Sequence, residues 1–394
     1  MRDESKPWIR KDGWADLPPM EPGPSPRART GATTSPSAAA AAAASTAADA
    51  SPAARSAGRV RAADGRVRAA DGRVRRAASA ATPPAAGPAR SRTVAPSPLD
   101  PGATRDPYRV HRVLREEFPL TFDPLLRAWV LSRYADVATA LTDARFTHGH
   151  RPGDPPCAQT HVDVDVAELR SVTARTAHVL ARRIADRPNA DLVADFCHWL
   201  PAGTVAAAVG VPYRDMMRLV RGRAASALAG QCTSQISMRE KALASFLAHV
   251  LVDPERAIAL RDAPAEQIAR AWTESLRHDP PVQIAVRRTA AEVRVSGGTI
   301  PAGEPVALLI GAACRDPERF RDPDRYDPLR DDPGQLSYGS GACPAVLLAE
   351  FEAEYAVRAL FDAMPRLRLA HGFRPERTGL ITRAPRSLLV RPGG

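Results

Sequence analysis

The chain has 394 residues, 44% of them hydrophobic and 25% charged, and carries a formal net charge of +11. Its alanine run at 38–44 falls far short of the ~20 apolar residues that span a bilayer, and its charged first residues, MRDESKPWIRKDGW, lack the apolar core of a secretory signal. Composition therefore argues against a membrane protein and for a cytoplasmic one, and five scattered cysteines argue against a disulfide framework.

Residues 1–98 differ in composition from the rest of the chain. They are rich in Ala, Pro and Ser and contain a seven-residue repeat, GRVRAAD, that begins at Gly58. With 16 Lys and Arg against 8 Asp and Glu, this segment has a net charge of +8, which leaves about +3 for the remaining 296 residues. It buries too little apolar surface to offset the entropy of folding, so we expect a disordered basic tail over 1–98 and a folded domain over 99–394. The basic repeats carry no aromatic residues for stacking, so nucleic acid is not an expected partner.

Beyond the tail, helical patterns dominate and short strand-like runs interrupt them. A helix is expected from Asp106-Pro107-Tyr108 to Glu117, and a strand pair near 128–133 leads into another helix. Further strand pairs are expected near 283–302 and 378–391. The pattern predicts a mainly α fold with a small β region to one side.

In the second half of the chain, the spacing of charged residues suggests a structural or binding role at two places. Glu274 and Arg277 lie three residues apart, so they share one helix face; alone, this spacing also suits an exposed ion pair of little energetic value. Arg288 lies in a strand-like run after Pro281, where a solvated arginine is the alternative to a functional one. Alternation along the strand points its neighbour Arg287 to the other face.

The segment Tyr338–Glu352, YGSGACPAVLLAEFE, is the most informative part of the chain. A glycine-rich turn runs into Cys343, and a helix-favouring apolar stretch follows. The free N–H groups and the dipole at a helix start favour a thiolate, which is the form that ligates a metal. No other cysteine lies near Cys343 in the sequence, so a cofactor that brings its own ligands, such as haem, suits it better than a zinc ion; an inert core cysteine is the alternative.

The order of these elements identifies a family resemblance. From about Leu228 to Val390, the run ESLRHDPPV, RRTA, IPAGE, AACRDPERF, DPDRYDP and the cysteine segment closely resembles the C-terminal half of a bacterial cytochrome P-450, a haem-thiolate monooxygenase. The resemblance implies the P-450 fold, shortened in the middle helices, with haem b (iron protoporphyrin IX) as cofactor.

The resemblance also assigns roles to residues around the haem. It implies that Cys343 is the iron ligand and that Arg288 pairs with a haem propionate, a task suited to a planar, always-charged donor. The cofactor-binding turn before the cysteine matches at Tyr338, Gly339 and Gly341.

A structural clamp and an oxygen-binding kink follow from the same resemblance. Glu274 and Arg277 are expected to be buried beneath the haem, with Arg325 or a neighbour of it as the third member. The catalytic residues are expected in the kink of the long central helix, where Ala229 and Gly230 let the helix open above the iron and Thr233 hands protons to bound oxygen. A small-residue helix crossing is the alternative for this segment.

The chain departs from the family pattern in several places. Between Phe146 and Asp191, His161 and Arg170 do not have the His-x-x-x-Arg spacing that the family uses for the haem propionates. About fifteen residues replace two long helices between Pro212 and Leu228, and Cys232 stands where an acidic residue usually precedes the threonine. Two residues are also missing before Cys343.

Two functions from different classes remain open. The first is a monooxygenase that inserts one oxygen atom of O2 into a small organic, secondary-metabolite type of substrate, with ferredoxin and ferredoxin reductase as electron donors. The second is a non-catalytic helper of the same fold that activates a partner enzyme such as a glycosyltransferase. Retention of Cys343 favours the enzyme, and the shortened segments favour the helper.

Overall fold

The structure is a computed structural model that describes residues 94–147, 166–208, 227–331, 334–337 and 344–393, with backbone alone at 207–208, 227–235 and 344–345. All of these residues belong to one compact unit. Of the predicted disordered tail over 1–98, residues 1–93 lie outside the described residues. The packed chain begins earlier than the predicted boundary at residue 99, because Ser97 is buried and Ala95 packs against a hydrophobic cluster around Leu114.

A five-stranded sheet forms the β region, with the order β1-β2-β8-β5-β3. The β2 and β8 strands pair in parallel, and the other neighbours are antiparallel. A hairpin of β6 and β7 turns through Gly297 at φ +90° and packs beside β1, where a side chain at 297 would crowd Pro119 and Leu120. The strands of the sheet and the hairpin are β1 (Leu120–Asp123), β2 (Ala128–Leu131), β3 (Phe146–Thr147), β5 (Ile284–Thr289), β6 (Val293–Val295), β7 (Gly298–Ile300) and β8 (Pro305–Leu309).

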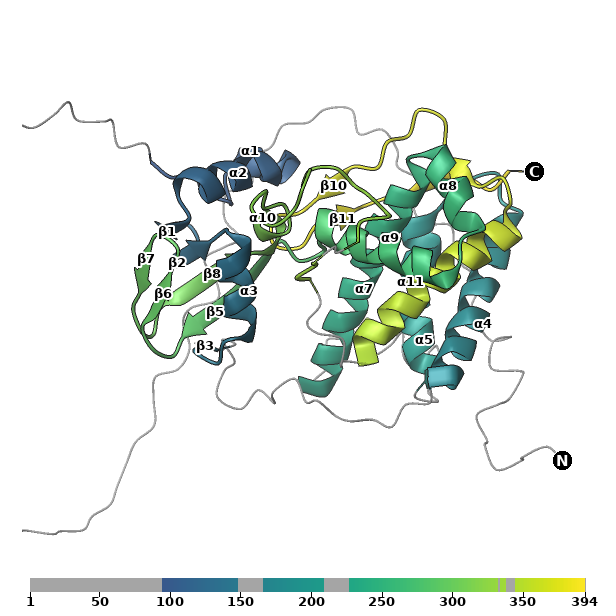
Figure 1. Cartoon of the computed structure of the whole chain (residues 1–394). Helices are drawn as coiled ribbons and strands as arrows, with labels where there is room; N and C mark the ends of the chain where they lie inside the picture. The colour runs from purple at the N-terminus through teal and green to yellow at the C-terminus, as the bar shows by residue number, and fades with distance from the viewer. Residues whose placement is uncertain (1–93, 148–165, 209–226, 332–333, 338–343, 394) are drawn as a thin grey trace, which may run out of the picture. The chain divides into compact units, whose positions relative to one another are not determined.

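Short helices lie next to this sheet (Figure 1). One of them begins where Asp106 accepts the N–H of Tyr108 and Pro107 occupies the first turn, a strong start signal that confirms the helix expected to end at Glu117. These helices are α1 (Pro101–Arg105), α2 (Pro107–Glu117), α3 (Tyr134–Thr142) and α10 (Ile310–Ala313).

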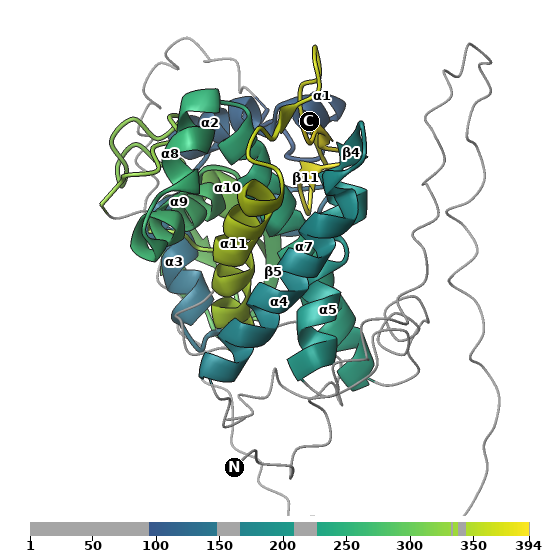
Figure 2. The ribbon, with the colours of Figure 1, turned by 90° about the vertical axis from the view of Figure 1, so that its right-hand side faces the viewer.

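The larger helices pack around the main hydrophobic core. Buried side chains such as Phe196, Phe246, Trp272 and Leu360 form one cluster there, and Figure 2 shows α4, α5, α7 and α11 side by side. These elements are α4 (Val166–Ala185), a π-helical turn η1 (Val193–Cys197), α5 (Leu200–Ala208), α7 (Ala227–Leu251), α8 (Pro254–Arg261), α9 (Ala265–His278) and α11 (Pro344–Ala363).

Small strands complete the described unit. Their order is β4-β12-β9 in one sheet and β10-β11 in another. The predicted mainly helical fold with a small β region is confirmed, and the expected strand regions near 128–133, 283–302 and 378–391 all contain strands. The remaining strands are β4 (Ala190–Asp191), β9 (Arg368–Leu369), β10 (Arg377–Thr378), β11 (Ala384–Pro385) and β12 (Leu389–Arg391).

Candidate active site

An ion pair on α9 lies at the centre of the candidate site. Arg277 Nε donates to Glu274 Oε2 at 2.7 Å, and Nη2 donates to Oε1 at 2.8 Å, so the contact is bidentate. Both side chains are 0% exposed, so the alternative of an exposed surface pair is wrong. Charges this deeply buried must find partners for their remaining donors and acceptors, or the cost of removing them from water dominates.

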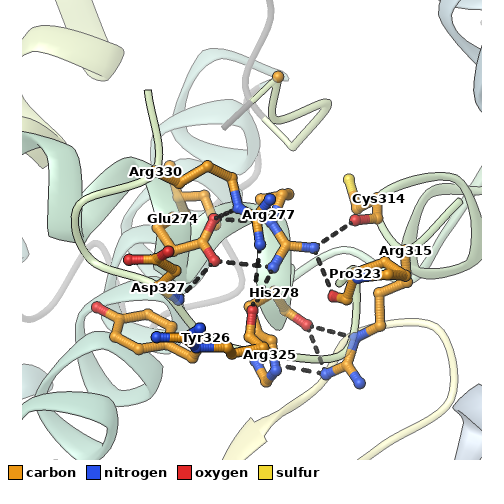
Figure 3. Close-up of polar contacts among 12 residues, drawn as sticks. Glu274, Arg277, His278, Cys314, Arg315, Pro323, Arg325, Tyr326, Asp327 and Arg330 are labelled. Carbon is orange, nitrogen blue, oxygen red and sulfur yellow. Dashed lines mark hydrogen bonds and ion pairs between the residues drawn. The ribbon is translucent and has the colours of Figure 1, made fainter. Parts of the chain in front are cut away.

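Arg277 has an acceptor for each of its five N–H groups (Figure 3). Besides the two bonds to Glu274, Nη1 donates to the carbonyls of Cys314 and Pro323, both at 2.8 Å, and Nη2 donates to the carbonyl of Arg325 at 3.1 Å. These three carbonyls belong to the segment that follows α10. One buried guanidinium therefore fastens that segment to α9.

Glu274 is held by the same segment. Its Oε1 accepts the backbone N–H of Asp327 at 2.9 Å, and Arg330 Nε lies 3.2 Å from its Oε2. The third charged side chain of the clamp is therefore Arg330. The prediction of Arg325 needs correction in this respect: its side chain is exposed, because the turn directs its carbonyl towards Arg277.

A histidine cluster lies beside the clamp. The ring of His249, at the end of α7, stacks on Tyr326 with centroids 4.3 Å apart, and His278 meets both rings edge-on. Arg377 Nη2 lies 3.3 Å from Nε2 of His249, a contact that requires the unprotonated nitrogen as acceptor. Burial lowers the pKa of His249 well below its usual value, and the positive charge of Arg377 lowers the pKa further. The ring of His249 is thus neutral at physiological pH.

Strand β5 presents alternate side chains to solvent. Val286 is 58% exposed and Arg288 is also exposed, whereas Arg287 between them is half-buried and points to the other face. Arg288 Nη1 donates to the carbonyl of Gly303. The strand therefore carries an exposed apolar side chain and an exposed cation on one face, with the cation anchored by a single carbonyl.

The remaining predicted site residues lie at the starts of α7 and α11. The backbone of Ala229, Gly230 and Thr233 is helical and belongs to the first two turns of α7, and their side chains lie outside the description. Helix α11 begins at Pro344, so the expected helix start directly follows Cys343 in the sequence. The predicted cofactor-binding residues before it lie outside the described residues: Tyr338, Gly339, Gly341 and Cys343.

Sequence reasoning missed several buried polar residues near these helices. Arg330 follows the clamp motif but has no distinctive spacing, and His249 has no motif at all. Arg239 and Glu352, which form a second buried ion pair between α7 and α11, are 113 residues apart. No local pattern could have joined them, since only the packing of two helices brings the side chains together.

Comparisons with known proteins agree with this geometry. A family model described as Cytochrome P450 matches residues 269–339, which include the clamp and β5. The chain is 28% identical over 370 residues to Cytochrome P450 107B1 of Saccharopolyspora erythraea, which covers 68% of this chain and 90% of that protein. It is 27% identical over 349 residues to Protein DesVIII of Streptomyces venezuelae, which covers 73% of this chain and 86% of that protein.

Solved structures share the fold. The crystal structure of CYP109E1 from Bacillus megaterium in complex with corticosterone superposes with a TM-score of 0.65 at 18% identity, and covers 74% of this chain and all of that one. None of the helices among the described residues is long and apolar enough to cross a membrane.

Proposed function

We propose that this chain, which belongs to the cytochrome P450 family, is a haem-thiolate monooxygenase that acts on a small organic substrate. The balanced reaction consumes O2, two electrons and two protons for each C–H bond converted to C–OH, and releases one water. The electrons would pass from NADPH through a ferredoxin reductase to a ferredoxin, and from the ferredoxin to this protein, in the cytoplasm. The observation that carries the proposal is the clamp of Glu274 and Arg277, because it fastens the segment leading to Cys343 onto α9 within this fold.

The described residues fit a haem at two points. Helix α11 starts one residue after Cys343, so a thiolate there would face the free N–H groups and the positive end of the helix dipole. On β5, exposed Val286 suits the apolar edge of a macrocycle, and exposed Arg288 suits a propionate. When bound through a thiolate, haem supplies the chemistry of O–O cleavage.

The protein's own residues would contribute position and protons. The clamp would hold the chain before Cys343 in place, because Arg277 ties together three carbonyls of that segment. Arg288 would neutralise and orient one propionate. Thr233, in the second turn of α7, would donate its hydroxyl proton towards the oxygen side of the site, and Gly230 would leave room there because it has no side chain.

A spectrum of the purified full chain, reconstituted with haem and reduced under carbon monoxide, tests this proposal. We expect the red-shifted Soret band of a thiolate-ligated haem, and Cys343→Ala should abolish it. Cys314→Ala serves as the control, since Cys314 is also buried and contributes only its carbonyl to the clamp. A band that survives in Cys343→Ala would refute the ligand assignment.

The helper function is the second candidate. It rests on the short connection between Pro212 and Leu228 and on the two residues missing before Cys343. A helper needs the fold but no haem. Absence of any thiolate band in the wild-type protein, together with stimulation of a partner glycosyltransferase by both wild type and Cys343→Ala, would favour this function over the enzyme.

A further inference from the structure

A second buried ion pair joins the two helices that carry the predicted haem site. Arg239 of α7 donates from Nη1 to Glu352 Oε1 of α11 at 2.7 Å, and the two side chains are 2% and 1% exposed. Thr204 of α5 donates to the same carboxylate oxygen at 2.5 Å. Three helices therefore meet at one carboxylate.

The pair lies a short distance along each helix from the predicted reacting groups. Arg239 follows Thr233 by six residues within α7, a rise of about 9 Å at 1.5 Å per residue. Glu352 follows Pro344, the first residue of α11 and the neighbour of Cys343 in the sequence, by eight residues, a rise of about 12 Å. A shift of one helix against the other at the pair would thus be transmitted to both ends of the site, because each helix is continuous over this length.

Neighbouring contacts fix the rotation of α7 as well as its position. Arg239 Nη2 donates to the carbonyl of Pro201 at 3.2 Å, and the next residue, Glu240, lies 3.2 Å from the ring of His198. Since adjacent residues on a helix point about 100° apart, two directions around α7 are held. The start of α5 and the turn before it provide both anchors.

Stability alone does not account for this pair. Glu352 Oε2 and Arg239 Nε are both buried without a hydrogen-bond partner in the described part of the chain. Burial raises the pKa of Glu352, against the opposing effect of Arg239 and of the Thr204 hydroxyl. A buried pair with unsatisfied atoms gains little or nothing over apolar side chains of similar volume.

We propose that Arg239 and Glu352 are positioning residues that set the register between α7 and α11, and thereby the spacing between the haem ligand and the oxygen side of the site. This inference rests on the proposed haem-thiolate function. The pair acts through the helices and does not touch the reacting atoms. It would favour one arrangement of the two helices, because a 2.7 Å contact between charged groups tolerates less sliding than apolar packing does.

The test replaces the pair by apolar residues of similar size in the double variant Arg239→Met/Glu352→Leu. The matched control is Arg170→Met/Glu354→Leu, which removes a 3.2 Å ion pair between α4 and α11 whose arginine is 42% exposed, together with the 3.0 Å contact of Glu354 to Arg358. Each protein is examined by urea denaturation and by the reduced carbon monoxide spectrum. Glu352→Gln, which removes the charge and keeps the shape, provides a second measurement should the double variant fail to fold.

We expect the denaturation midpoint of the Arg239/Glu352 double variant to match or exceed that of the wild type. In this double variant, the fraction of the reduced carbon monoxide complex that shows the thiolate-type band should fall at least threefold. The fraction should fall less in Glu352→Gln, and the conservative variant Arg239→Lys should restore it to the wild-type value. The control should keep the wild-type fraction. If the double variant and Glu352→Gln both keep the wild-type fraction of thiolate-type complex, the inference is overturned. If the wild-type protein itself shows no thiolate band, the proposed function is overturned, and this inference with it.

Discussion

Replacement of Arg277 by lysine is the sharpest test of the clamp. Lysine keeps the charge but carries three donors on one nitrogen, so it cannot reproduce a bidentate contact and three carbonyl contacts. At least two of five hydrogen bonds are lost in a fully buried site, and each bond to a charged group is worth about 1.5–3 kcal/mol. We therefore expect the free energy of unfolding to fall by about 3–5 kcal/mol, a large part of the roughly 5–15 kcal/mol that a domain has in total.

Urea denaturation followed by far-ultraviolet circular dichroism measures this loss. Arg270→Lys is the matched control, because Arg270 lies on the same helix and pairs at 2.7 Å with Asp331, which is fully exposed; its cost should stay within about 0.5 kcal/mol. Arg330→Ala, which removes the contact to Glu274 and the hydrogen bonds to the carbonyls of Arg321, Asp322 and Arg325, should cost about 1–3 kcal/mol. If Arg277→Lys costs no more than Arg270→Lys, the clamp does not hold the segment after α10 in place.

Three further predictions concern pH, the N-terminus and proton delivery. The folded protein lowers the pKa of His249, so below the unfolded-state pKa of about 6.5 the unfolded chain binds more protons than the folded one. The contribution of this group to stability is therefore complete above that pH, and the free energy of unfolding falls by about 1.4 kcal/mol for each pH unit below it. His249→Gln should reduce the slope of unfolding free energy against pH by that amount, and an unchanged slope would refute this prediction. Deletion of residues 1–93 should leave the midpoint of urea denaturation unchanged. Deletion of 1–99 should lower the midpoint, because Leu99 packs against a buried cluster. Equal midpoints for the two deletion variants would refute this prediction. Cys232→Glu should raise the ratio of product to NADPH consumed in a reconstituted assay, since a carboxylate exchanges protons near neutral pH more readily than a thiol; no improvement would show that protons arrive by another route.

Local chemistry made much of the fold predictable from the sequence. The helix that begins after Asp106 was expected because a capping aspartate and a first-turn proline satisfy or remove the free N–H groups of a helix start. The helix after Cys343 was expected from a glycine turn followed by an apolar run, and it begins at Pro344. Strand regions and the shared face of Glu274 and Arg277 depend on spacing within a few residues, which the sequence displays directly.

The burial and the partners of those residues depend on tertiary structure. The spacing of Glu274 and Arg277 suits an exposed pair as well as a buried one, and only the packing of the segment after α10 removes both from water. The same packing makes Arg330, rather than the side chain of Arg325, the third charge of the clamp, because a turn decides whether a residue contributes its carbonyl or its side chain.

The family resemblance and the mainly helical fold could be read from the sequence alone, because they follow from motifs that are each confined to a short stretch, whereas the roles of the site residues stay predictions. The tertiary structure decided which distant side chains meet. Arg239 and Glu352 lie far apart in the chain and carry no motif, yet they form a 2.7 Å contact in the interior. Such contacts arise from the approach of whole helices driven by apolar burial, and no local spacing encodes them.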